Sequence, residues 1–148
     1  MSKVNYDVTV AVAGVPTMSG KVYTKEALEK AVKVFNERHA KRGVLHGELA
    51  IPSLQRSRLP NNQIDPNDVV VIDERHVSHT YDNVRMEGDA MKISAVLLDT
   101  PDGKDVEQYL NQSGGQPTFG IRSLLPPGVE QDNITDLVPV SVDIVRVQ

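Results

Sequence analysis

The chain has 148 residues and a formal net charge of −4, from 16 Lys and Arg against 20 Asp and Glu. A chain of this length usually forms one domain, so we expect a single domain over residues 1–148. Its 39% hydrophobic and 24% charged residues are typical of a globular protein and argue against a disordered or fibrous chain.

Three further features of the composition narrow the function. The absence of Cys excludes disulfides, thiolate nucleophiles and Cys-type zinc sites. The negative net charge, with only four Tyr, two Phe and no Trp, argues against binding of nucleic acid. The chain has no run of about 18 apolar residues and does not begin like a signal peptide. We therefore expect a cytoplasmic protein that does not contact a membrane.

The first half of the chain predicts a strand, a helix and a second strand. Residues 4–12 alternate apolar with smaller or polar side chains, which indicates a half-buried strand. Thr24 is a candidate N-cap for a helix over residues 25–42, which Gly43 ends. Residues 44–50 predict a short strand. Residues 51–67 contain three Pro and two adjacent Asn, which predicts an exposed loop.

The second half predicts five more strands, three before a helix and two after it. Strands are expected at 69–72, 76–84 and 91–98, the last two joined by a turn at residues 87–89. Thr100-Pro101 begins a helix that has Val106, Tyr109 and Leu110 on one side and ends at residues 114–115. Strands at 118–125 and 137–147 complete an α+β fold, a mainly antiparallel sheet or small β-barrel flanked by helices. In the last strand, one face is formed by Val138, Val140, Val142 and Ile144, and the other by Ser141 and Asp143.

Four His residues are candidates for chemistry in a chain without Cys. His39 lies near the end of a helix, where a surface role is expected. The pairs His46 with Glu48 and His76 with His79 do not match the spacing of standard metal motifs, so no metal site is expected. Because side chains alternate along a strand, His76 and His79 face opposite sides and only one of them can serve a given site.

The stretch from Gly114 to Ser123 leads from a Gly-rich turn into a strand. Such a turn can expose a hydroxyl and direct backbone N–H groups at a developing oxyanion, but the glycines equally explain the end of a helix. The residues alone therefore indicate a soluble α+β domain with a weak signal for a hydrolase.

Six short motifs follow one another between residues 18 and 145. They are MSGKVY at 18–23, GELAIP at 47–52, HVSH at 76–79, LDTPDGK at 98–104, GQPTFG at 115–120 and VDIV at 142–145. In their order and spacing they resemble the motifs of the prohead core proteases of tailed bacteriophages. That resemblance implies a fold similar to that of herpesvirus assemblin.

The resemblance also implies an activity. Members of this family are serine proteases that cleave scaffold, core and capsid proteins inside the immature head, so the expected location is the host cytoplasm, within the assembling prohead. No cofactor or metal is implied, and a homodimer or larger ring is expected.

Carried over by motif, the general base is His79 and the nucleophile position, Ser in the family, is Thr118. Ser123 is the rival nucleophile if the local register differs, and the third member of the triad is Asp143. The oxyanion or substrate would be bound around the three residues Phe119, Gly120 and Arg122.

Three departures from the family pattern keep a second interpretation open. Thr118 replaces the Ser nucleophile, Ile51 replaces a His and Phe119 replaces an Arg. Because the extra methyl group of Thr restricts the attacking hydroxyl, the chain could instead be an inactive homologue that serves as a structural component of capsid assembly. An unrelated peptide-binding sheet domain is a third possibility.

Overall fold

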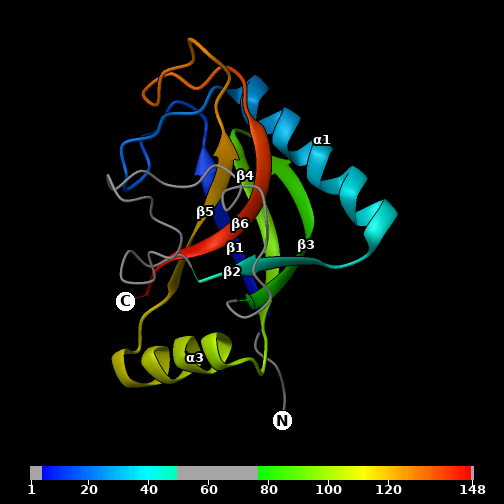
Figure 1. Cartoon of the computed structure of the whole chain (residues 1–148). Helices are drawn as coiled ribbons and strands as arrows, with labels where there is room; N and C mark the ends of the chain where they lie inside the picture. The colour runs from blue at the N-terminus through cyan, green and yellow to red at the C-terminus, as the bar shows by residue number, and fades with distance from the viewer. Residues whose placement is uncertain (1–4, 50–76, 148) are drawn as a thin grey trace, which may run out of the picture.

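The computed structural model describes residues 5–49 and 77–147 (Figure 1). Its elements run in the order β1 (Asn5–Val12), α1 (Lys25–Arg42), β2 (Leu45–Glu48), β3 (Val77–Glu87), β4 (Ala90–Leu97), α3 (Pro101–Ser113), β5 (Pro117–Leu124) and β6 (Val138–Val147). The predicted α+β class is confirmed. The predicted loop at 51–67, the predicted strand at 69–72, Ile51 and His76 lie outside the described residues.

The strands form two antiparallel sheets. One sheet has the order β1-β4-β3-β2, and the other is the pair β5-β6. A single parallel bridge between Leu49 and Ile144 connects the end of β2 to β6, so the sheets adjoin without closing into a barrel among the described residues. Helix α1 lies alongside the upper part of the strands, and α3 covers their lower end (Figure 1).

Helix α1 has the predicted bounds because its end signals are local. The Thr24 hydroxyl accepts a hydrogen bond from the Ala27 N–H at 3.2 Å, and Gly43, with φ +81°, follows the last turn. The side chains of Ala27, Leu28, Ala31 and Phe35 are buried against the sheet.

Helix α3 also begins and ends as predicted, but fewer of its side chains are buried than the prediction implies. The Thr100 hydroxyl caps the Gly103 N–H at 3.1 Å, and Gly114 ends the helix in the left-handed region. Val106 and Leu110, four residues apart, are buried. Tyr109, expected on the same side, is not buried with them: its position one residue before Leu110 turns it towards the edge of this face, and it is 50% exposed.

The alternation predicted for β6 holds for only part of the strand. Val138 is 49% exposed because it pairs with Leu124, also exposed, at the end of the two-stranded sheet. Ser141 and Asp143 are buried, as Val142 and Ile144 are. Both faces of the middle of β6 are therefore covered, one by apolar side chains and the other by a polar cluster.

The hydrophobic core extends between the two sheets and under both helices. Its largest fully buried apolar side chains are Tyr23, Phe35, Leu28, Met91, Ile93, Ile134, Leu137 and Ile144. Within the described residues, no helix combines the length and the apolar character needed to cross a membrane.

Candidate active site

His79 lies in the interior of the protein, on β3, one of the two inner strands of the four-stranded sheet. Its side chain has no exposed surface, and both ring nitrogens have partners: Nδ1 lies 2.8 Å from the Ser78 Oγ and Nε2 lies 2.8 Å from the Val142 carbonyl oxygen. The ring of Phe119 packs edge-on against the imidazole, with centroids 5.1 Å apart. Burial lowers the pKa of His79 to about 4, although its hydrogen bond to Val142 opposes this shift. The imidazole is therefore neutral at pH 7.

The glycine of the GEL motif permits β2 to approach this ring closely. A Cβ atom at Gly47 would overlap both the Val142 carbonyl oxygen and His79 Nε2. The φ of Gly47 is not positive, so the requirement is for space rather than for an unusual backbone conformation. The motif glycine thus allows β2, β3 and β6 to meet at the Nε2 edge of His79.

The LDTPDGK motif contacts the start of β3, the strand that carries His79. The Thr100 hydroxyl donates to the Val77 carbonyl oxygen, and the Leu98 N–H donates to the Ser78 carbonyl oxygen at 3.0 Å. A Cβ atom at Gly103 would lie 2.8 Å from that Ser78 oxygen and would overlap the Leu98 carbonyl oxygen. The first turn of α3 is therefore packed directly on the backbone that carries Ser78 and His79.

A second polar cluster is built around Arg122. Its guanidinium bonds both Glu48, at 2.7 Å, and Asp143, at 2.8 Å. Asp143 also accepts hydrogen bonds from the Glu48 N–H at 3.0 Å and from the Ser141 hydroxyl at 2.8 Å. Burial raises the pKa of Asp143, and the Arg122 charge opposes that rise. The cluster connects β2, β5 and β6 through buried charges.

The two candidate nucleophiles occupy different faces of β5. The two shifts in the β5-β6 register each place the extra residue on β6, so β5 itself keeps its alternation. Ser123 therefore shares the face of Phe119, whose ring contacts His79, whereas Thr118 shares the face of Arg122. Ser123 lies four residues along the strand from Phe119, or about 13 Å.

The structure brings together some of the predicted site residues and not others. His79 contacts Phe119, and Arg122 contacts Asp143. Both ring nitrogens of His79 are taken by Ser78 and Val142, so neither Thr118 nor Ser123 is bonded to them. Gly120 lies opposite Asp143 in the β5-β6 pair, between Phe119 and Ile121.

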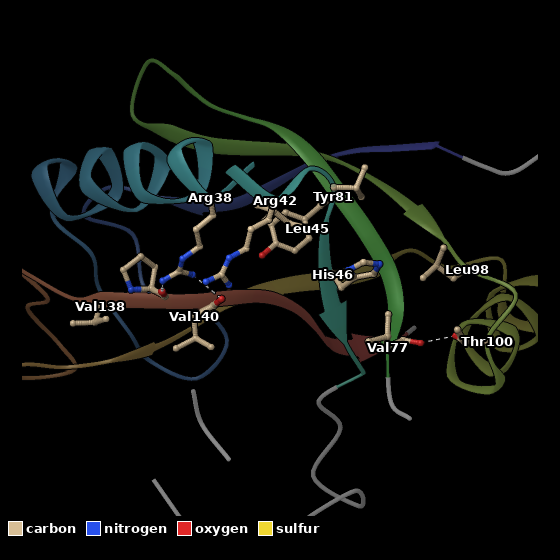
Figure 2. Close-up of a pocket in the computed structure, with 12 residues that line it drawn as sticks. Arg38, Arg42, Leu45, His46, Val77, Tyr81, Leu98, Thr100, Val138 and Val140 are labelled. Atoms are coloured by element: carbon tan, nitrogen blue, oxygen red, sulfur yellow. Dashed lines mark hydrogen bonds between the residues drawn. The ribbon is translucent and has the colours of Figure 1, made fainter. Parts of the chain in front are cut away.

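A pocket of about 820 Å³ opens beside this site, between β2, β6 and the end of α1 (Figure 2). Arg38, Arg42 and His46 give it a basic wall, and no Asp or Glu is among the described residues that line it. Arg38 donates hydrogen bonds to the carbonyl oxygens of Pro139 and Val140 on the edge of β6. The remaining lining is largely apolar: Val44, Leu45, Val77, Tyr81, Leu98, Thr100 and Val138.

Sequence reasoning did not single out Gly47, Glu48 or Ser78 as site residues, although all three lie within the recognised motifs. The signal available in the sequence was their place in these motifs, with Ser78 directly before His79; the contacts of Gly47 with His79 and of Glu48 with Arg122 appear only in the structure. In the part of the chain described, no group of three or more His, Asp or Glu is arranged to bind a metal ion.

Comparison with known proteins gives a similarity of fold. No protein-family model matches the chain, and no curated protein matches it significantly. Among solved structures, the bacteriophage T4 capsid assembly protease matches with a TM-score of 0.65 and 20% sequence identity, over 96% of this chain and 81% of that one. The chain therefore has the fold of a phage capsid assembly protease, and the fold expected from the prohead protease motifs is confirmed.

Proposed function

We propose that this chain, as a single domain with the fold of a phage capsid assembly protease, is an endopeptidase of phage head maturation. It acts within the assembling prohead in the host cytoplasm and cleaves scaffold, core and capsid proteins. The observation that carries the proposal is the convergence of separate motifs on one buried histidine. The described segments at 47–48, 77–79, 98–104, 115–120 and 142–145 all contribute residues that touch His79 or support its strand.

In the proposed reaction, His79 is the general base and a hydroxyl of β5 is the nucleophile. The hydroxyl oxygen attacks the peptide carbonyl carbon while His79 takes its proton, and N–H groups around Phe119 and Gly120 bind the resulting oxyanion. The protonated His79 then gives the proton to the leaving amine. A water molecule, deprotonated by His79 in its turn, releases the acyl group.

The pairing of His79 with Val142 implies a conformational step before chemistry. A base needs a free lone pair, and Nε2 gains one only when it loses its proton and leaves the Val142 oxygen. Ser123 is the preferred nucleophile because it shares the face of Phe119, whose ring contacts His79. Thr118 is the second candidate because it occupies the position of the family's nucleophilic Ser. Either hydroxyl reaches His79 only if β5 moves relative to β3, and assembly into a homodimer or ring is the proposed trigger.

The proposed substrate is an extended peptide with small or acidic residues near the cleaved bond. The pocket beside β2 and β6 supports this choice because its charged lining residues, Arg38 and Arg42, are basic. The guanidinium of Arg122 is held by Glu48 and Asp143, so it serves the fold rather than the oxyanion.

The experiment is to incubate the purified chain with the scaffold and capsid proteins of the same phage and to follow cleavage by electrophoresis and mass spectrometry. His79→Ala should abolish cleavage, whereas the matched surface variant His39→Ala should not. Ser123→Ala and Thr118→Ala identify the nucleophile by which of them also abolishes it. Cleavage that survives His79→Ala would refute the mechanism.

A second candidate function is that of an inactive homologue that contributes to capsid assembly as a structural component. It is favoured by one observation, namely that both nitrogens of the buried His79 have internal partners and neither β5 hydroxyl is among them. On this alternative, the wild-type chain binds scaffold or capsid protein without cleaving it.

A further inference from the structure

Two consecutive buried residues, Ser78 and His79, form a hydrogen-bonded pair. Neither side chain has exposed surface, and the Ser78 Oγ lies 2.8 Å from His79 Nδ1. The Val142 carbonyl oxygen on the far side of the ring can only accept a hydrogen bond, so Nε2 carries the proton of the neutral ring. Nδ1 is then unprotonated and accepts from the Ser78 hydroxyl.

We infer that Ser78 is the positioning residue of His79 and that its hydroxyl holds the ring at Nδ1 in either tautomer. The inference rests on the proposed function, in which His79 is the general base. It adds the group that orients the base, which is the role predicted above for Asp143. Asp143 instead gives its carboxylate oxygens to Arg122, Ser141 and the Glu48 N–H.

A hydroxyl suits this position because it can donate or accept. In the observed state it donates to Nδ1, and Nε2–H is bonded to Val142. In the working state the ring loses the proton at Nε2 and gains one at Nδ1 through exchange with water, so its charge is unchanged. Ser78 then accepts from Nδ1–H, and the lone pair of Nε2 faces the nucleophile. A carboxylate, which only accepts, would favour the second state alone.

The backbone of Ser78 is fixed independently of its side chain. Its carbonyl oxygen accepts from the Leu98 N–H, and the first turn of α3 approaches it closely at Gly103. The Thr100 hydroxyl holds the preceding residue, Val77. The LDTPDGK motif therefore fixes the position from which Ser78 reaches the ring, and replacement of the Ser78 side chain should not displace the strand.

The direct test is the tautomer of His79, read by ¹H–¹⁵N correlation spectra of protein labelled with ¹⁵N-histidine, with His79→Gln used to assign the resonance. Wild type at pH 7 should show a protonated Nε2 and an unprotonated Nδ1. Ser78→Ala should shift the Nδ1 resonance downfield, since its donor is lost, and the matched strand variant Ser94→Ala should not. A wild-type ring protonated at Nδ1, or an Nδ1 resonance unchanged in Ser78→Ala, would overturn the inference.

Cleavage kinetics test whether Ser78 matters for the reaction. Ser78→Ala should lower kcat by about 10- to 100-fold with little change in KM, less than the loss in His79→Ala, because the base is present but not held. Ser78→Thr, which restores the hydroxyl, should recover most of the rate; if it does not fold, the spectra of wild type and Ser78→Ala still decide. An unchanged kcat in Ser78→Ala would refute the positioning role. A wild type that cleaves nothing would refute the proposed function, while the spectra would test the tautomer separately.

Discussion

The two buried polar clusters of this protein lie on opposite faces of the β5-β6 sheet and use different chemistry. Around His79, three neutral groups are joined by hydrogen bonds, and the ring is enclosed by Phe119 and Gly47. Around Arg122, one guanidinium is bonded to two carboxylates. On the Arg122 face, ion pairs connect the strands. On the other face, the imidazole of His79 is kept neutral because burial disfavours its charged form.

The two clusters differ in which predicted and unpredicted residues they contain, and the role of Asp143 as third member of the triad stays a prediction. Asp143 is an acid next to the predicted site, yet its partners are those of a structural ion pair. Ser78 is an inconspicuous hydroxyl, yet it contacts the candidate base. We expect substitutions in the Arg122 cluster to alter mainly the stability of the fold, and substitutions around His79 to alter mainly the rate of cleavage.

The largest expected effect on stability is that of Arg122→Ala. It leaves Glu48 and Asp143 buried without their countercharge, so the free energy of unfolding should fall by about 3–5 kcal/mol, measured by urea denaturation. The control Arg85→Ala removes ion pairs to Asp7 and Glu87 that solvent screens, so it should lower the free energy of unfolding far less than Arg122→Ala. Equal losses of unfolding free energy for the two variants would show that the buried Arg122 cluster contributes no more than exposed ion pairs do.

The next effect is a dependence of stability on pH that comes from His79. Its pKa is about 4 in the folded protein, against 6.5 for an unperturbed imidazole, so the unfolded state binds a proton first as the pH falls. The stability that His79 contributes is fully present above pH 6.5 and is lost towards pH 4, a change of roughly 3 kcal/mol.

Urea denaturation between pH 7 and pH 4 measures this loss. His79→Gln should remove it, and Asp143→Asn should leave it in place. The raised pKa of Asp143 acts in the opposite direction, since its contribution is favourable at low pH and is lost as the pH rises. A steep acid loss that persists in His79→Gln would show that another group is responsible.

Gly47→Ala should have a smaller effect on stability and a clear effect on the site. Its Cβ would overlap the Val142 carbonyl oxygen and His79 Nε2, so β2 must shift, at a cost of about 1–3 kcal/mol. The matched glycine Gly120 would place its Cβ 3.1 Å from a Val145 methyl group, which can move, and Gly120→Ala should cost under about 1 kcal/mol. Thermal denaturation of the pair measures the difference, and equal losses would contradict the close approach at Gly47.

The smallest expected effect concerns the pocket. Arg42→Glu should raise KM for an acidic peptide by about tenfold without altering kcat, because the basic wall attracts negative charge. The neighbouring exposed residue Lys41, which does not line the pocket, provides the control Lys41→Glu. A similar rise in KM for both variants would indicate long-range attraction rather than binding in the pocket.

Local signals in the sequence predicted local structure well. Thr24, Gly43, Thr100 and Gly114 mark the helix ends because capping depends on residues within one turn. The burial of Asp143 could not be predicted in this way, because it depends on Glu48, 95 positions away in the chain. The motifs indicated which segments belong to the site, but the partners of each side chain required the packing of two sheets.

On the proposed mechanism, this chain cleaves proteins of phage head assembly with His79 as the base. The most direct measurement is cleavage of its own scaffold and capsid proteins by wild type, His79→Ala and His39→Ala, each confirmed to be folded by circular dichroism. We predict discrete fragments with wild type and His39→Ala, and none with His79→Ala. Cleavage that is unchanged in His79→Ala, or is absent from the folded wild type in assembled proheads, would contradict the claim.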